Sequence, residues 1–263
     1  MRPDPMRPDP WAPLRAATPA RIGLGRVGTA PSLESVLALR SAHAATRDAV
    51  WTPPEWAAIE ADLTERGIEW HSAQSQVPDR ATYLLRPDLG RVLSDDSQQR
   101  VAGLRSAGGV EYDVAIVLVD GLSGEALTHH AVPLVGLLRR WCEARSWRVA
   151  PVICVRQGRV AVGDEVGAAL GARMVLVVIG ERPGLSAADS LGLYLTYDPE
   201  PGRMDSERNC ISNVRPGGLA LDDAARLAEA YAVAARQQAL TGTALMVELP
   251  RTGSASDEIG PVG

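Results

Sequence analysis

The pattern of hydrophobic and polar positions divides the chain into two zones. The first, residues 29–105, is mainly helical. Ser32 can cap a helix whose apolar positions recur with helical spacing. A second helix is expected to begin at Pro53-Pro54 and to end at Gly67, a residue that suits the left-handed end of a helix. The spacing predicts a third helix after Pro87.

From about residue 110 the pattern changes to strands that alternate with helices. Continuous apolar runs, typical of strands buried on both faces, occur at 112–119, 149–155 and 174–179. The segments around them predict helices at 124–144 (interrupted by Pro133), 164–170 and 221–239, and a further strand at 191–197. This alternation indicates right-handed crossovers and an α/β fold with a doubly wound, mostly parallel sheet.

These zones predict four segments. They are a flexible Pro-rich leader and entry loop at 1–28, an N-terminal helical region at 29–109, a ligand-binding α/β domain at 110–249, and a flexible tail at 250–263. The leader opens with the pentapeptide MRPDP written twice, and its prolines argue against regular helix there. The tail is rich in Gly, Ser and Asp and is expected to fray.

Two absences in the composition exclude several reaction classes. The chain has 263 residues with 27 Arg, no Lys and no Phe. Without Lys it can form no Schiff base with pyridoxal phosphate or with a carbonyl substrate. It also has neither the lysine of a Walker-type phosphate loop nor the strand lysine of a protein kinase. The net charge of −5 and the dispersed Arg residues argue against nucleic acid as a partner.

Cysteine usage and hydropathy predict a reducing, cytosolic compartment. Cys142, Cys154 and Cys210 are odd in number and widely spaced, unlike a secreted disulfide framework or a zinc site. The longest apolar runs are far shorter than the roughly 18 residues of a membrane span. No secretory signal is visible at the start of the chain. We therefore expect no membrane partner.

A glycine string near the start matches a nucleotide-binding fingerprint. Gly23-Leu-Gly-Arg-Val-Gly28 reproduces G-x-G-x-x-G, which requires a strand before it and a helix that begins inside it. Here Thr18-Pro19 precedes the string, and Pro31 follows before any periodic helix, which favours a loop that enters a helix. A dinucleotide-binding module is one alternative function.

A second string lies where the nucleophile of an α/β hydrolase would lie. Asp120-Gly-Leu-Ser-Gly124 joins a buried strand to a helix, but Glu125 stands where a nucleophile elbow needs a second glycine. The hydrolase order of serine, acid and histidine also fails, because the last histidine is His130. Capping of the following helix by Ser123 or Asp120 explains the same string. A hydrolase that uses Ser123 is the other alternative function.

The four histidines do not form the pattern of a metal site. His129 and His130 are adjacent and face about 100° apart on a helix, so they cannot bind one metal in the i, i+4 manner. His43 and His71 are isolated in the sequence. No metal ligand is predicted.

Three loops that follow strands are rich in glycine and polar residues. They are residues 156–164, 180–185 and 208–213. Ligands of doubly wound sheets bind beyond the carboxyl ends of the strands, and Glu181 and Asn209 are among the groups that could hydrogen-bond a flat ligand there. Tight turns with capped ends explain the same composition equally well.

Several segments resemble the small subunit of bacterial ethanolamine ammonia-lyase. The resemblance starts at Asp9-Pro-Trp and runs to about residue 240. It includes TPARIGLGR from Thr18, YLLRPDLG from Tyr83, DGLS from Asp120, GRVA from Gly158, VIGERPGLS from Val178 and RNCISN from Arg208. Many ungapped motifs in the right order are far more specific than any single glycine string.

The resemblance implies a subunit of a lyase that depends on adenosylcobalamin and converts ethanolamine to acetaldehyde and ammonia. Radicals formed when a cobalt–carbon bond breaks carry out this step of ethanolamine degradation. The resemblance further implies that a large subunit, a β/α barrel, holds the substrate. The small subunit then folds as a Rossmann-like sheet, which makes residues 110–249 a cobalamin-binding domain, and closes over the cofactor at the subunit interface. The implied location is the bacterial cytoplasm; a bacterial microcompartment is the alternative, and the Pro-rich leader argues against it.

Carried over motif by motif, the resemblance implies cofactor contacts at Val160, Glu181 and Cys210, with Asp120 and Asn209 as further candidates in neighbouring loops. It implies no catalytic residue in this chain. A neutral Cys or Val at the surface of the cofactor packs rather than reacts. None of the histidines lies in an Asp-x-His-x-x-Gly string, which in some folds replaces the cofactor's own base. We therefore expect dimethylbenzimidazole to stay on cobalt.

Overall fold

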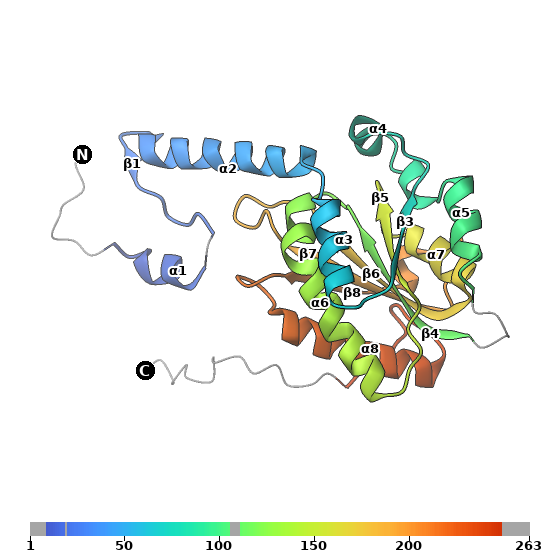
Figure 1. Cartoon of the computed structure of the whole chain (residues 1–263). Coiled ribbons are helices and arrows are strands. Elements are labelled where there is room, and N and C mark those ends of the chain that lie inside the picture. Colours follow the sequence, from blue (N-terminus) through green and yellow to red (C-terminus); the bar gives the residue numbers. More distant parts are fainter. Residues whose placement is uncertain (1–8, 19, 106–110, 249–263) are drawn as a thin grey trace.

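A six-stranded sheet runs through the middle of the molecule (Figure 1). The computed structural model describes residues 9–18, 20–105 and 111–248. The strands are β3 (Trp70–Gln74), β4 (Tyr112–Val119), β5 (Val152–Arg156), β6 (Ala172–Gly180), β7 (Leu191–Tyr197) and β8 (Asn209–Val214). Their spatial order is β3-β5-β4-β6-β7-β8, with β3, β5, β4 and β6 parallel and the pairs β6–β7 and β7–β8 antiparallel. The predicted α/β fold with a mostly parallel sheet is confirmed.

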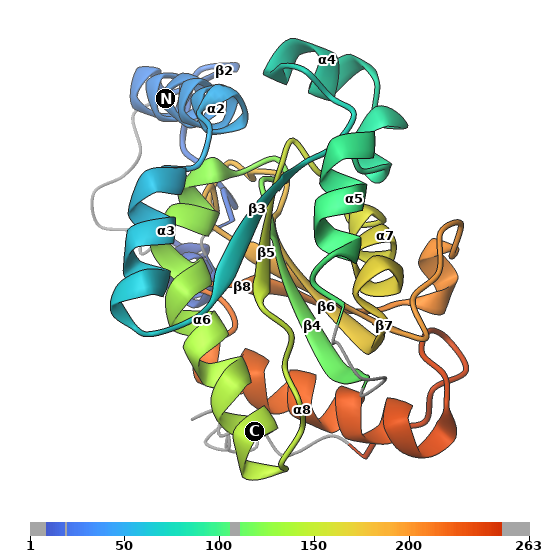
Figure 2. The same ribbon diagram turned by 45° about the vertical axis from the view of Figure 1, so that its right-hand side comes forward.

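Helices cover both faces of the sheet (Figure 2). On one face lie α3 (Trp56–Glu65), α6 (Gly124–Ala144) and α8 (Leu221–Gln238), and on the other lie α5 (Asp95–Ala102) and α7 (Val162–Leu170). The chain passes from β4 through α6 to β5 and then through α7 to β6, so consecutive crossovers run over opposite faces.

The central strand β4 separates two hydrophobic cores. Its even-numbered residues Val114, Ile116 and Leu118 face α3, α6 and α8, and its odd-numbered residues Ala115, Val117 and Val119 face α5 and α7. All six are fully buried. A strand enclosed on both faces needs an unbroken apolar run, which is the pattern that the sequence shows.

Most predicted elements of the second zone are confirmed. β4, α6 and β7 begin and end at the predicted residues, and α6 continues through Pro133 without a break. Two strands of the six-stranded sheet were not predicted. β3 has the short and largely polar sequence WHSAQ and lies in the stretch expected to be helical, and β8 lies in a segment expected to be a loop.

The prediction of a helix after Pro87 was wrong. Only the 3₁₀ turn η1 (Leu89–Arg91) follows this proline, and Val92 is extended. Helices form on either side of it instead: α4 (Arg80–Leu85), capped by Asp79, and α5, capped by Ser94. Each cap accepts a hydrogen bond from the backbone three residues on, a local signal that outweighs the apolar spacing. A second 3₁₀ turn, η2 (Asp205–Glu207), precedes β8.

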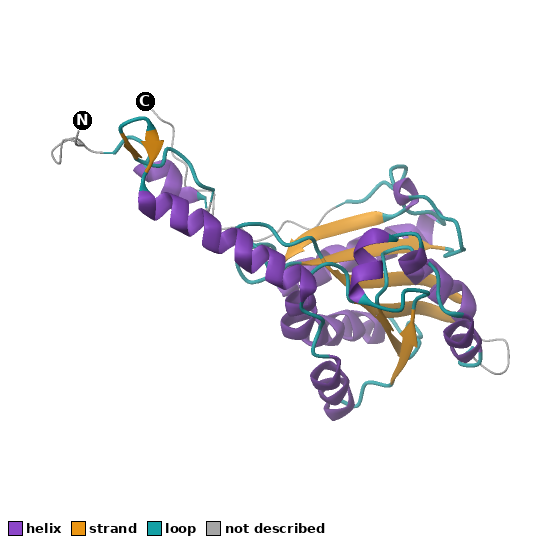
Figure 3. Ribbon diagram, turned by 90° about the horizontal axis from the view of Figure 1, so that it is seen from above, coloured by secondary structure: helices purple, strands orange, loops and turns teal. Residues whose placement is uncertain are grey.

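The described residues between 9 and 51 form an N-terminal arm, which extends away from the sheet (Figures 1 and 3). It comprises α1 (Ala12–Ala17), the hairpin strands β1 (Arg26–Val27) and β2 (Ala30–Pro31), and the long helix α2 (Leu33–Trp51). Ser32 caps α2 as predicted. The helix α1 was not expected, but Pro13 lies in its first turn, where a helix tolerates proline. The duplicated pentapeptide lies almost wholly, and the predicted tail entirely, outside the described residues.

We predict that the contact between the end of β6 and the turn after β4 tolerates no side chain. A Cβ at Gly180 would lie 2.1 Å from the backbone oxygen of Ser123, so Gly180→Ala should destabilise the subunit by at least about 2 kcal/mol, as overpacking does. The matched control is Gly136→Ala in α6, where a Cβ meets nothing within 4 Å and should stabilise the helix by about 0.5–1 kcal/mol. Urea unfolding of both variants checks this, and equal effects would contradict it.

Candidate functional site

A cavity of about 460 Å³ lies at the carboxyl ends of β4 and β6. Its lining comes from the loops after β4, β5 and β6, from β7 and from the region around α4. The lining residues are Tyr83, Pro87, Arg91, Gly121, Leu122, Arg159, Val160, Ala161, Ile179, Gly180, Glu181, Arg182, Tyr194 and Asp205. This is the edge at which the sequence analysis expected a ligand.

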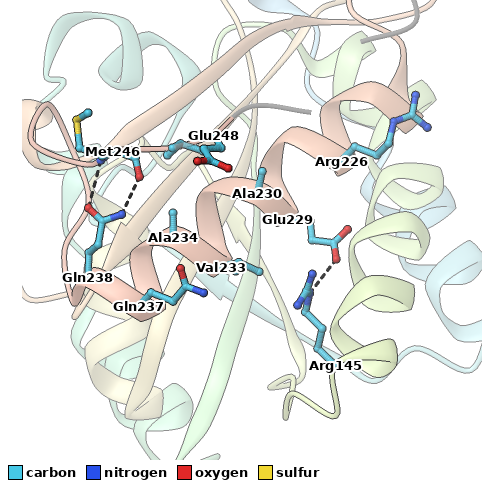
Figure 4. Close-up of a pocket in the computed structure, with 11 residues that line it drawn as sticks. Arg145, Arg226, Glu229, Ala230, Val233, Ala234, Gln237, Gln238, Met246 and Glu248 are labelled. Carbon is cyan, nitrogen blue, oxygen red and sulfur yellow. Dashed lines mark hydrogen bonds and ion pairs between the residues drawn. The ribbon is translucent and has the colours of Figure 1, made fainter. Parts of the chain in front are cut away.

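A larger cavity, of about 820 Å³, lies between α8 and residues 246–248 (Figure 4). Several of its polar groups already have partners: Arg145 donates to Glu229, and the side-chain amide of Gln238 bonds both backbone polar atoms of Met246. It also lies away from the carboxyl ends of the strands that carry the predicted residues, and we do not assign it a ligand.

Ser123 serves as a helix cap. Its Oγ accepts a hydrogen bond from the backbone N–H of Ala126 at 3.1 Å and donates one to the backbone oxygen of Ala188 at 2.6 Å. The side chain is fully buried. The nearest candidate base, His130, instead lies 3.4 Å from Asp189. A serine that is buried and engaged in this way is not a nucleophile, so the capping interpretation fits the structure and the hydrolase does not.

The glycine string at 23–28 lies in the N-terminal arm, far along the chain from any strand of the large sheet. Gly23 has φ +56°, and a Cβ there would lie 2.2 Å from Cγ of Trp11. The string leads into the β1–β2 hairpin rather than into the first turn of a helix. A dinucleotide fold requires that helix N-terminus, and its place here is taken by a turn.

Asp120 is a buried carboxylate beside the cavity, directly before the lining residue Gly121. It is 1% exposed, and its Oδ1 has no hydrogen-bond partner among the described residues. Burial raises the pKa of Asp120 to about 6, against the opposing effects of a hydrogen bond from the backbone of Gln157 and of the positive charge of Arg80. A perturbed carboxyl group at a cavity is typical of a functional site.

Tyr83 lies between two guanidinium groups at the rim of the cavity. The central carbon of Arg159 lies 3.9 Å from the ring centroid, and that of Arg80 lies 4.5 Å from it. The Tyr83 hydroxyl donates to the backbone oxygen of Gly158 at 3.1 Å, and burial raises the pKa of Tyr83 to about 12. This phenol therefore stays neutral and holds α4 against the loop after β5.

Sequence reasoning did not identify these residues as part of the site. Tyr83 begins the segment YLLRPDLG, which indicates the family but not a role for this tyrosine in the site. Its stacking partners Arg80 and Arg159 are 79 residues apart in the chain, as their numbers show, and no local pattern indicates that contact.

The structure brings together three of the five predicted cofactor contacts. Val160 and Glu181 line the same cavity. Oε2 of Glu181 accepts hydrogen bonds from the Ser190 hydroxyl at 2.8 Å and from the backbone N–H of Asn213 at 3.1 Å, which fixes its orientation. Asp120 lies behind the cavity wall.

The other two lie on β8. Cys210 is paired in the sheet with Tyr194, a lining residue, and is exposed beside the cavity; desolvation raises the pKa of its thiol, so it is neutral at pH 7. Asn209 points elsewhere: its side-chain amide both donates to and accepts from the backbone of Gly242, at 3.1 and 2.8 Å. In the structure Asn209 ties down the chain after α8.

Three arginines line the cavity, together with the acidic residues Glu181 and Asp205. Arg91, Arg159 and Arg182 line it, and none of them forms an ion pair with a described carboxylate. Nε of Arg159 is buried and also without a hydrogen-bond partner among the described residues. Guanidinium groups without a carboxylate partner suit a phosphate or carboxylate on a ligand.

Comparison with known proteins identifies the family. A sequence model described as ethanolamine ammonia-lyase light chain (EutC) matches residues 8–246. The chain belongs to this family. It is 48% identical over 251 residues to the ethanolamine ammonia-lyase small subunit of Pseudomonas fluorescens strain Pf-5, which covers 95% of this chain and 91% of that relative. Identity is 50% over 215 residues to the small subunit of Azotobacter vinelandii (82% and 80% covered) and 51% over 213 residues to that of Ralstonia nicotianae (80% and 78%).

Family membership confirms the resemblance on which the sequence analysis relied and the prediction of an ammonia-lyase subunit. Within the described residues of this light chain, no helix combines the length and the hydropathy needed to cross a bilayer. The described part of the chain also holds no group of three or more His, Cys, Asp or Glu side chains arranged around a metal ion.

We predict that the charge of Asp120 destabilises the fold at neutral pH. Because burial raises its pKa from 3.8 to about 6, its contribution to stability is full below about pH 4 and is lost as pH rises through 6. Asp120→Asn cannot ionise, so it should gain stability relative to the natural protein between pH 4 and pH 7. Thermal and urea unfolding at several pH values measures this difference.

A second buried carboxyl group serves as an internal control when the Asp120→Asn variant is compared with the natural protein. Asp164 is also buried, with a pKa raised to about 6, but it is present in both proteins and cancels. A stability difference between the two proteins that does not change with pH would contradict the assignment.

Proposed function

We propose that this chain is the small subunit of an adenosylcobalamin-dependent ethanolamine ammonia-lyase. In this proposal the enzyme converts ethanolamine to acetaldehyde and ammonia by a radical mechanism, and a large subunit holds the substrate. Family membership over residues 8–246 supports the reaction, and the name small subunit, carried by the relatives, supports a larger partner. The observation that carries the cofactor assignment is the cavity that joins Val160 to Glu181.

We interpret the sheet as Rossmann-like and doubly wound. The crossovers through α6 and α7 lie on opposite faces of the sheet, and the cavity opens at the carboxyl ends of β4 and β6, between which the winding changes sides. Doubly wound sheets bind their ligands at this kind of position.

The chemistry of the lining fits part of a cobalamin. Leu122, Val160, Ile179 and Tyr194 offer apolar surface to a flat ring or to a nucleotide base. The three arginines line the same cavity, and their charge would suit the phosphodiester in the nucleotide tail of the cofactor. A cavity of about 460 Å³ has the size of a site for a drug-sized ligand, and cobalamin is far larger. The rest of the cofactor must lie outside this chain, which agrees with closure by a second subunit.

Adenosylcobalamin, when bound, supplies the radical that reacts with the substrate. In this proposal the residues of this chain bind the cofactor and orient it. Glu181, fixed by Ser190 and Asn213, presents a hydrogen-bond acceptor, and the neutral side chains of Val160 and Cys210 supply packing surface. None of the four histidines lines the cavity, so this chain would offer no imidazole to a cobalt ion bound there. We further place the complex in the bacterial cytoplasm, with a bacterial microcompartment as the alternative location.

Reconstitution tests this function. The purified chain on its own should release no ammonia from ethanolamine, because in the proposed enzyme the large subunit holds the substrate. It should restore activity when combined with the large subunit and adenosylcobalamin. The large subunit with the cofactor but without this chain is the control. Activity of this chain alone would contradict the assignment.

Binding of truncated cofactors tests the phosphate contact. In the assembled enzyme, Arg91→Met with Arg182→Met should weaken cyanocobalamin binding by tenfold or more, since one charged hydrogen bond contributes about 1.5–3 kcal/mol. Binding of cobinamide, which lacks the nucleotide tail and its phosphate, should not change. Absorbance-monitored equilibrium dialysis measures both.

The matched control replaces Arg66, an exposed arginine on the end of α3, with Met. Equal weakening for cobinamide and cobalamin would show that the two cavity arginines do not contact the tail.

A further inference from the structure

Most of the exposed apolar surface of the described chain is concentrated on the N-terminal arm. Eight of the twelve large hydrophobic side chains that are exposed lie there. They are Trp11, Leu14, Leu24, Val27, Leu33, Leu37, Leu39 and Trp51, with Val27 and Leu33 more than 70% exposed. Scattered single exposures need no explanation, but a cluster of this kind on one projecting element marks an interaction surface.

The long helix of the arm contacts the rest of the described chain only near its C-terminal end. Of the 19 residues of α2, only Ala49 is buried. Leu33 and Leu37 are one turn apart and therefore lie on one face of the helix, with exposures of 73% and 55%. Most of the stability of helices in proteins comes from the packing of an apolar face, so the exposed apolar face of α2 calls for a partner.

The root of the arm is fixed beside the cavity. Arg80 donates through Nε to the backbone oxygen of Val50, in the last turn of α2, and through Nη1 to the backbone oxygen of Gly121, which lines the cavity. Thr46 lies 3.4 Å from the backbone oxygen of Gly184, in the loop after β6. The arm therefore leaves the molecule at the same edge of the sheet at which the cavity opens.

We propose that the arm is a docking element for the large subunit, and that its apolar side, carried by Leu33 and Leu37, inserts into an apolar groove of that subunit. The existence of this partner rests on the proposed function. The cavity wall and the arm are continuous, because Arg80 is hydrogen-bonded to both, so the interface proposed at the cavity would extend onto the arm. The family match begins at residue 8, so the arm belongs to the segment that the family shares.

Charge argues against an arrangement in which two arms of this chain pack against each other. The described residues of the arm carry five arginines and three acidic residues, although the whole chain has a net charge of −5. Two arms packed together would bring like charges into contact, whereas a partner groove with acidic residues at its rim would complement them.

The test uses the full chain with Leu33→Asp and Leu37→Asp. Because neither side chain is buried, the variant should have the same unfolding temperature as the natural protein. Affinity for the purified large subunit, measured by biolayer interferometry, should fall at least 100-fold. The matched control is Ala57→Asp with Ala61→Asp, which places two carboxylates one turn apart on the exposed side of α3 and should leave the affinity within about threefold of the natural value.

A second measurement does not depend on the variants. Amide hydrogen exchange across α2 of the natural protein should slow when the large subunit is added. Unchanged exchange, or unchanged affinity of the Leu33/Leu37 variant, would overturn the docking proposal. The proposal would also be overturned if the natural chain is a dimer on its own, the Leu33/Leu37 variant is a monomer, and both bind the large subunit with the same affinity. Failure of the natural chain to bind or activate the large subunit would instead overturn the proposed function.

Discussion

The site depends on a close approach between two backbone segments, the turn after β4 and the end of β6. The N–H of Leu122 donates to the backbone oxygen of Gly180 at 2.8 Å, and a Cβ at Gly121 would lie 2.0 Å from that oxygen. Gly121 also has φ +61°, which glycine adopts without strain. This contact sets where α6 begins, forms the floor of the cavity, and presents the carbonyl of Gly121 to Arg80.

Two carboxyl groups, Asp120 and Asp164, are buried at an energetic cost, and burial raises the pKa of each to about 6. Asp120 has an unpartnered oxygen beside the cavity. Asp164, in the first turn of α7, lies 2.8 Å from Arg208, and both side chains are 2% exposed. The Asp164–Arg208 pair connects α7 to the residue before β8 and thus positions Cys210 next to Tyr194. Buried ion pairs contribute little net stability but specify one arrangement of the elements that they join, and we infer that role for Arg208.

Sequence patterns predicted the centre of the fold better than its edges. β4 is apolar along its whole length because helices cover both its faces, so its run of hydrophobic residues was unambiguous. β3 lies at the edge of the sheet and pairs with β5 alone. Its sequence, Trp70-His-Ser-Ala-Gln, contains no apolar run that would predict a strand. At the site, motifs located Val160 and Glu181 on adjacent loops. The stacking of Arg80 and Arg159 on Tyr83 arises from tertiary packing, which periodicity and spacing do not encode.

Arg80 couples the position of the N-terminal arm to the wall of the cavity. Its guanidinium is bonded to the end of α2 on one side and to the cavity wall on the other, so a shift of the helix changes the position of Gly121. Two binding events that share such an element are linked, and linkage is reciprocal. In the proposed enzyme, any factor by which subunit assembly raises the affinity for cofactor is the same factor by which bound cofactor raises the affinity between the subunits.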